Sequence, residues 1–125
     1  MISVEVENRS GTDFDETGAV AFARGVLAAE GIEEGDLGLQ LVSRDEIRSL
    51  KREHLGLDEE GDVLSFPIDA REPVPEGVPR QLGDVVLCPQ VVADDWRRPL
   101  AHGLLHLLGY EHGDGMEARE AELTR

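Results

Sequence analysis

Apolar and polar residues alternate along two segments of the chain, and this pattern predicts β-strands. Every second residue is apolar in residues 2–6, and the same period recurs in residues 37–42. A period of two places the apolar side chains on one face of a strand. Residues 62–66 and 82–87 are short runs of strand length, and Pro67 is expected to end the first of them.

Helices are predicted between these strands, with a short helix through residues 91–96 that has Pro89 near its start, and a proline-rich loop over residues 69–81. A helix is expected to begin at a side chain that accepts a hydrogen bond from the first backbone amides and to end at a glycine. The expected boundaries are Asp13 or Asp15 and Gly31 for the first long helix, Ser43 (with Glu46 in a capping box) and Gly56 for the second, and Pro99 and Gly109 for the last.

The last predicted helix, residues 99–108, is apolar on nearly every side. Five of its ten residues are leucine. A helix without a polar face is expected to be buried in the protein. This helix nevertheless carries His102 and His106, so we single out these two side chains as candidates for chemistry.

The length and composition fit one domain with one hydrophobic core. The chain has 125 residues, of which 40% are hydrophobic, so residues 1–125 are expected to form a single domain. The one cysteine, Cys88, excludes an internal disulfide framework and a zinc site built from cysteines. The sequence has neither a membrane-spanning apolar run nor a signal-peptide pattern, so we expect a soluble, cytoplasmic protein with no membrane partner.

The charge of the chain is strongly acidic. Asp and Glu number 27 against 12 Lys and Arg, which gives a net charge of −15. The basic surface typical of nucleic-acid-binding proteins is therefore absent at the level of net charge. We interpret the acidity as a solvated surface, with adaptation to salt as an alternative. Any contact with nucleic acid is expected at a local positive patch.

Three of the four histidines fall within residues 102–112, HGLLHLLGYEH. His102 and His106 share one helix face, and Gly109 can reverse the chain so that His112 returns to the same side. Three imidazoles with one open position are the ligand set of a catalytic zinc site, and another divalent transition metal is an alternative. The competing interpretation is that core hydrogen bonds satisfy each imidazole, but burying several unpaired imidazoles would be costly.

The histidine spacing, HxxxHxxGxxH, is that of the metzincin zinc proteases. Metzincins carry a glutamate directly after the first histidine, and it is the general base of peptide hydrolysis. This chain has Gly103 at that position, so a metzincin-like metallopeptidase would lack its proton carrier. A glycine inside a helix lowers stability. We therefore expect Gly103 to be needed either for close packing or to leave room for a substrate.

The same segment resembles the signature HGxLHLxGYDH of the YbeY endoribonucleases, or rRNA maturation factors, with Glu111 in place of the aspartate. Residues 62–67 (DVLSFP) and 82–86 (LGDVV) are similar to two further family segments, and Met116 and Glu120 match the family's residue types. The resemblance implies an α/β (α+β) domain with a four-stranded mixed sheet and a buried metal-binding helix. It also implies a metal-dependent endoribonuclease specific for single-stranded RNA. Such an enzyme acts in rRNA 3′-end maturation and ribosome quality control, with the ribosomal small subunit or assembly proteins as partners.

One position departs from the family pattern where an arginine is associated with RNA phosphate. Counting back from the DVLSFP segment places this arginine at Leu55 and its tyrosine neighbour at His54. Leucine cannot pair with phosphate, whereas arginine can do so with two hydrogen bonds. Arg52, Arg97 and Arg98 are therefore the candidate RNA-binding residues, and a solvated surface position is the alternative for each.

Two carboxylates complete the candidate site. Glu111 is a candidate acid–base group or partner of the metal site, with an exposed turn position as the alternative. Asp84 is a candidate for orienting a ligand histidine, with capping or turn formation as the alternative. The missing arginine and the acidic surface leave open a second function, that of a non-catalytic ribosome-assembly factor whose metal is structural.

Overall fold

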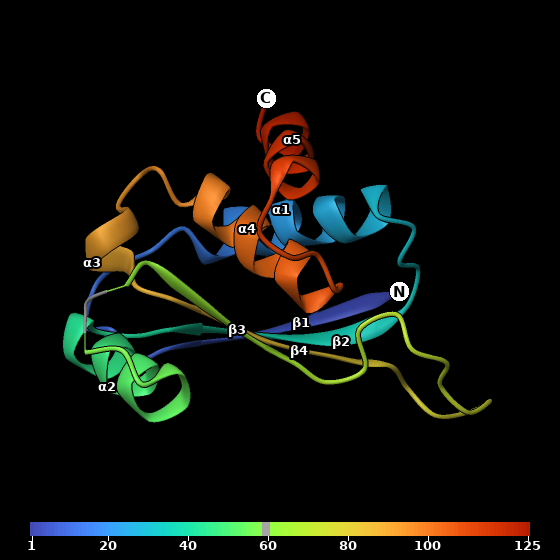
Figure 1. Cartoon of the computed structure of the whole chain (residues 1–125), viewed down its shortest axis with the longest axis horizontal. Helices are drawn as coiled ribbons and strands as arrows, with labels where there is room; N and C mark the ends of the chain where they lie inside the picture. The colour runs from blue at the N-terminus through green and yellow to red at the C-terminus, as the bar shows by residue number, and fades with distance from the viewer. Residues whose placement is uncertain (59–60) are drawn as a thin grey trace.

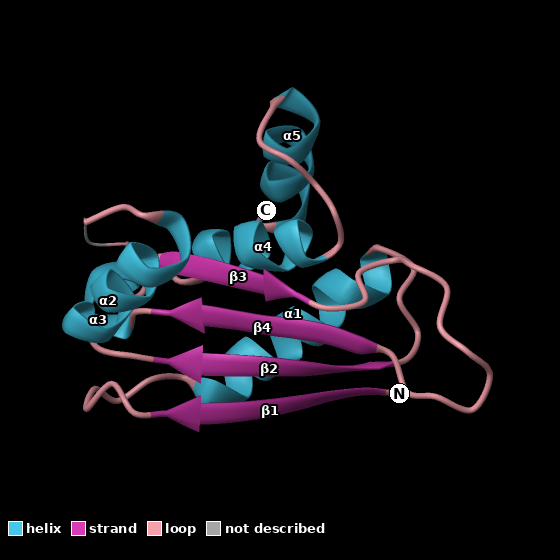
Figure 2. Ribbon diagram, turned by 60° about the horizontal axis from the view of Figure 1, so that its bottom comes forward, coloured by secondary structure: helices cyan, strands magenta, loops and turns pink. Residues whose placement is uncertain are grey.

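A four-stranded mixed β-sheet forms the centre of the protein (Figures 1 and 2). The computed structural model describes residues 1–58 and 61–125. In spatial order the strands are β1 (Ile2–Asn8), β2 (Gly35–Leu41), β4 (Gln81–Leu87) and β3 (Val63–Pro67). β1, β2 and β4 are parallel, and β3 runs antiparallel to β4 at the edge of the sheet. The mixed sheet implied by the family resemblance is thus confirmed.

Helices cover both faces of this sheet. Those in the described residues are α1 (Glu16–Ala29), α2 (Arg44–Leu55), α3 (Pro89–Val92), α4 (Arg97–Leu107) and α5 (Asp114–Leu123). α1 and α4 lie on one face, and α5 stacks on α4 on the side away from the sheet (Figure 1). α2 lies on the opposite face, so the predicted α+β class is confirmed.

The hydrophobic core has two parts, one on each face of the sheet. The larger part lies under α1 and α4 and includes the fully buried Leu27, Leu39 and Leu104. The smaller part lies under α2, where Ile47 packs against Val86. Within the described residues, no helix is both long enough and apolar enough to cross a membrane.

The N-cap residues predicted for α1 and α2 can be compared with the hydrogen bonds at the two helix N-termini. The Asp15 carboxylate accepts a hydrogen bond from the Gly18 amide at 3.0 Å. Of the two predicted candidates, Asp13 and Asp15, the N-cap of α1 is therefore Asp15. The Ser43 hydroxyl accepts from the Glu46 amide at 3.2 Å, as predicted. The Glu46 carboxylate, however, pairs with Arg9 at 2.6 Å. A charge-assisted contact between two segments thus engages the side chain expected to complete the capping box.

Two helix boundaries differ from the sequence-based expectation. The short helix predicted through residues 91–96 spans Pro89–Val92: it begins at the proline expected near its start, which suits a first turn, but it ends four residues before Trp96. Trp96 lies outside it, 5% exposed, and its ring contacts those of Phe14 and Phe22. α4 begins at Arg97, two residues before the expected start, because proline is tolerated throughout the first turn of a helix.

Strand β3 includes Pro67, which was expected to lie beyond its end. Proline lacks a backbone N–H and is confined to edge strands, bulges or the first residue of a strand. Among the described residues, β3 pairs with β4 alone, so its second edge needs no hydrogen-bond donors. The position of β3 in the sheet therefore explains why the strand continues through the proline.

Gly103 allows α4 to lie close to β3 and β4. A Cβ atom added at this residue would lie 2.9 Å from a γ-carbon of Val63 and 2.9 Å from one of Val85. The Ser65 hydroxyl also donates a hydrogen bond to the Gly103 carbonyl at 2.7 Å, which joins helix to strand. Of the two explanations offered for this glycine, the structure supports close packing.

Candidate metal centre

His102, His106 and His112 come together on the exposed side of α4, as their spacing predicts. Their ligand nitrogens all lie within 4.8 Å of one another, and the group could hold a metal ion. The Nε2 atoms of His102 and His106 are 3.1 Å apart. Two nitrogens bound tetrahedrally to one zinc ion at about 2.05 Å would lie about 3.3 Å apart. The arrangement therefore fits a metal ion with imidazole ligands.

The turn after α4 brings His112 to this point. Gly109 adopts a φ of +97°, and its amide donates to the His106 carbonyl at 3.1 Å. The Tyr110 amide donates to the Leu105 carbonyl at 3.0 Å. These two bonds form a Schellman motif, in which the left-handed residue reverses the chain. The reversal predicted at the glycine is confirmed, and it carries His112 back toward the helix.

The outer nitrogens of the two helical histidines also have partners. His106 Nδ1 lies 3.0 Å from the Tyr110 carbonyl, so Nδ1–H donates and the Nε2 lone pair faces the centre of the group. His102 Nδ1 lies 3.3 Å from the carboxylate of Glu120 on α5. Contacts of this kind hold metal-binding imidazoles in the required tautomer and orientation.

The surroundings of His106 favour its neutral form. Burial lowers the pKa of His106 below its ordinary value, and the neighbouring imidazoles of His102 and His112 lower it further. The hydrogen bond to the Tyr110 carbonyl acts in the opposite direction without reversing the shift. Because a metal binds neutral imidazole, the shift keeps His106 ready to act as a ligand.

Glu120 is a candidate site residue to which the sequence analysis assigned no role. Only 7% of this residue is exposed, and its second oxygen accepts from Arg98 Nε at 3.3 Å. The signal in the sequence was the match of Met116 and Glu120 to residue types of the family it resembles, whereas their burial on α5 is seen only in the structure. Asp84 does not take this role. It lies on β4 over Gly38, on the face of the sheet opposite α4.

A cavity of about 870 Å³ opens beside the three imidazoles. Leu55 and Leu57 form part of its wall and are 55% and 44% exposed. The remaining lining residues come from the end of α2, strand β3, and the turns and helices around α4: Lys51, Asp62, Val63, Leu64, Ser65, Pro67, Asp95, Arg98, Pro99, His102, His106, His112 and Glu120. The histidines therefore face a space large enough for part of a substrate.

Comparisons with known proteins identify the family. The family model described as Endoribonuclease YbeY matches residues 5–124. The endoribonuclease YbeY of Mycobacterium ulcerans is 38% identical, over 95% of this chain and 76% of the relative. That of Halorhodospira halophila is 39% identical, over 70% of this chain and 64% of the relative.

The chain belongs to the YbeY endoribonuclease family. The resemblance drawn from the histidine segment is therefore confirmed. A solution structure of a Thermotoga maritima protein has the same fold, with a TM-score of 0.55 and 22% identity over 98% of this chain and 86% of the other.

Leu55, which ungapped counting aligned with the YbeY arginine, lies in the cavity wall. Its side chain is 55% exposed, so Leu55 is not part of the hydrophobic core. Of the candidate RNA-binding residues, Arg98 lines the cavity, whereas Arg97 lies 4.5 Å from the centre of the Trp96 ring. Arg52 binds Asp58 at 2.9 Å. Glu111 is exposed in the turn that precedes His112.

Proposed function

We propose that this protein is a metal-dependent endoribonuclease that hydrolyses phosphodiester bonds of single-stranded RNA during rRNA 3′-end maturation and ribosome quality control in the cytoplasm. The observation that carries the proposal is the group of three imidazoles beside an open cavity. Membership of the YbeY family supports the choice of RNA as the substrate. The ribosomal small subunit and its assembly proteins are the proposed partners.

His102, His106 and His112 would hold the metal. A set of three imidazoles favours zinc, although other divalent transition metals bind the same ligands. When bound, such an ion supplies activation of water and stabilisation of negative charge on phosphate oxygens. The chain itself keeps His106 neutral by burial and orients the imidazoles through the Tyr110 carbonyl and Glu120.

Cationic side chains around the cavity are the proposed RNA contacts. Arg98 is the first candidate because it lines the cavity beside the histidines. Arg52 and Arg97 are next in sequence to the lining residues Lys51 and Arg98 and would contact phosphates farther along the strand. Glu111 stays the candidate acid–base group, since it directly precedes His112 in an exposed turn.

A non-catalytic assembly factor with a structural metal is the second candidate function. It is favoured by Leu55, an uncharged side chain at the place of the family arginine, and by the net charge of −15. Gly103 argues against a metzincin-like peptidase, because it stands where metzincins carry their catalytic glutamate. A glutamate side chain at this position would also have to displace the side chains of Val63 and Val85.

The decisive experiment measures bound metal and RNA cleavage on the same preparation. The protein is incubated with a single-stranded RNA and with its duplex, before chelation, after chelation and after zinc is restored. The proposal predicts cleavage of the single strand that is lost with the metal and restored by zinc. His106→Ala serves as the matched inactive variant. Bound metal with no cleavage would support the assembly factor, and cleavage of a peptide substrate instead would support the peptidase.

A further inference from the structure

The cavity beside the histidines contains a cationic side chain that the function proposed above does not use. Apart from the histidines, the cations among its described lining residues are Lys51 and Arg98. Arg98 belongs to α4 and pairs with the carboxylate of Glu120 at 3.3 Å. Lys51 is half-buried and belongs to α2, on the opposite face of the sheet. The cavity therefore receives one cation from each face of the sheet.

The end of α2 and the start of β3 both pack around Lys51. Gly56 has a φ of +69°, and the Leu57 amide donates to the Lys51 carbonyl at 3.3 Å, so the chain turns back over the end of the helix. Gly61 is buried just before β3 and lies against the lysine side chain. A Cβ atom added at Gly61 would lie 2.8 Å from each of Cδ, Cε and Nζ of Lys51.

The lysine side chain, and not the backbone, accounts for the glycine at residue 61. Gly61 is not among the glycines of this chain with a positive φ, so its backbone does not require glycine. The atoms that a Cβ would meet are the outer atoms of Lys51. The absence of a side chain at Gly61 therefore leaves the room in which Lys51 extends.

The other charges of the cavity wall oppose the entry of a phosphate. Asp62, Asp95 and Glu120 also line the cavity, and carboxylates repel a phosphodiester. An ammonium group has three donors and binds phosphate as a compact charge. Leu55 lies four residues after Lys51, on the same side of α2, and has no charge to offer. On this wall of the cavity, Lys51 is thus the lining residue suited to phosphate.

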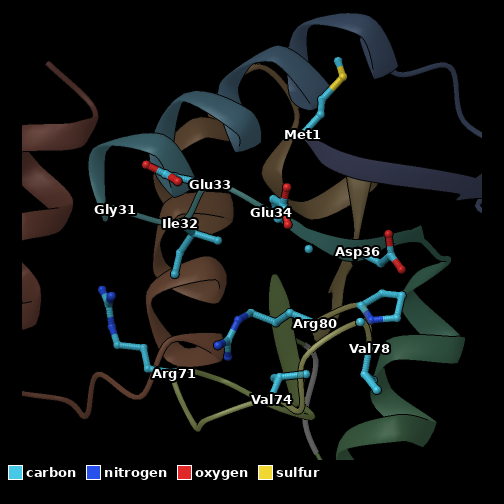
Figure 3. Close-up of a pocket in the computed structure, with 13 residues that line it drawn as sticks. Met1, Gly31, Ile32, Glu33, Glu34, Asp36, Arg71, Val74, Val78 and Arg80 are labelled. Atoms are coloured by element: carbon cyan, nitrogen blue, oxygen red, sulfur yellow. The ribbon is translucent and has the colours of Figure 1, made fainter.

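A second cavity, of about 780 Å³, is a poorer place for RNA although two arginines line it (Figure 3). Arg71 donates to the carboxylate of Glu30 at 2.9 Å, and Arg80 donates to the carbonyl of Ala70 at 2.7 Å. Both guanidinium groups are held by other groups of the protein. None of the described residues that line this second cavity is a histidine.

We propose that Lys51 binds a phosphate of the RNA strand in the cavity beside the histidines, and that Gly61 keeps the lysine side chain in position for this contact. The inference rests on the proposed function, because it takes RNA as the substrate. One charge-assisted hydrogen bond corresponds to about a tenfold change in affinity. One phosphate contact on a single strand contributes about −0.7 to the slope of log affinity against log salt.

The test compares the zinc-loaded wild type with Lys51→Ala, Gly61→Ala and the double variant. The kcat and KM for a single-stranded RNA are measured, and so is the affinity for single-stranded DNA of the same sequence at several salt concentrations. DNA offers the same phosphates as RNA, so this second measurement does not depend on cleavage. Tm is recorded for each variant.

We expect Lys51→Ala to weaken binding about tenfold, to lower the magnitude of the salt slope by about 0.7, and to raise KM more than it lowers kcat. Gly61→Ala should show a smaller loss in the same direction, because its methyl group displaces the flexible end of Lys51. It keeps every charge, so net charge cannot explain this loss. In the double variant Gly61→Ala should add no further loss, since the lysine atoms that it would displace are gone.

Arg24→Ala is the matched control, because it removes one positive charge from α1 at a residue that lines neither cavity. We expect it to leave the salt slope and KM unchanged. An unchanged slope and KM in Lys51→Ala overturn the inference and leave the proposed function standing. Equal losses in Arg24→Ala also overturn it, because net charge would then explain them. A wild type that binds with a slope lowered in Lys51→Ala, but cleaves no RNA, refutes the proposed function and supports the phosphate contact.

Discussion

The close approach of α4 to the sheet can be tested by adding one methyl group at Gly103. In Gly103→Ala the new Cβ would lie 2.9 Å from γ-carbons of Val63 and Val85, closer than side chains normally pack. Valine is β-branched and cannot turn its methyl groups away at low cost. Either the helix moves away from the sheet or the strands shift.

Two opposing effects set the size of the change. Alanine is favoured over glycine inside a helix by about 1 kcal/mol. Extra volume in a well-packed core costs about 1–3 kcal/mol. With a packing cost near the middle of that range, we expect Gly103→Ala to lower the free energy of unfolding by about 1 kcal/mol. For a domain of this size that corresponds to a fall in Tm of about 4 °C.

Thermal unfolding of Gly103→Ala beside Gly25→Ala measures the packing effect. Gly25 is also inside a helix, α1, but a Cβ there would meet nothing within 4 Å. Gly25→Ala should therefore raise the stability by about 1 kcal/mol, the full helix-propensity gain. The two variants should shift Tm in opposite directions. Equal stabilisation of both would refute the packing explanation for Gly103.

Four further results are expected. Leu55→Arg should leave Tm unchanged, because Leu55 is 55% exposed. The same variant should raise the rate of RNA cleavage by up to about tenfold. A stable variant without this gain favours the assembly factor. His106→Ala should lose its metal by elemental analysis, and full occupancy in the variant contradicts the site. Wild-type affinity should fall in acid as His106 becomes protonated, and because burial lowers the pKa of His106, this loss should lie below the usual imidazole range. Chelation should lower the wild-type Tm in calorimetry, since the ion stabilises the native state. Affinity for free RNA should fall steeply with salt, by a log–log slope of about −0.7 per phosphate contact.

The strands and most helices could be predicted from local patterns, whereas the order of the strands could not. Alternation identified β1 and β2, and the side-chain caps at Asp15 and Ser43 were correct. Strand order depends on which apolar faces meet in space, and a single sequence does not contain this information directly. The antiparallel edge position of β3, and with it the tolerance of Pro67, therefore emerged only from the structure.

The grouping of the histidines was predictable because helix geometry and a left-handed glycine determine it over eleven residues. The contacts behind them were not. α5 has few apolar residues and no helical pattern, so neither the helix nor the contact from Glu120 to His102 was foreseen.

Under the proposed function an acidic protein acts on RNA, and the charges at and near the cavity determine how free RNA should bind. Arg98 lies 3.3 Å from Glu120 and Arg52 lies 2.9 Å from Asp58, so phosphate must compete with carboxylates for both. The net charge of −15 repels free RNA at long range, but salt screens this repulsion beyond about 8 Å at physiological ionic strength. A strand that a partner already holds against the cavity encounters the histidine centre at closer range than this. We therefore expect poor binding of free RNA together with cleavage of RNA that the ribosome presents.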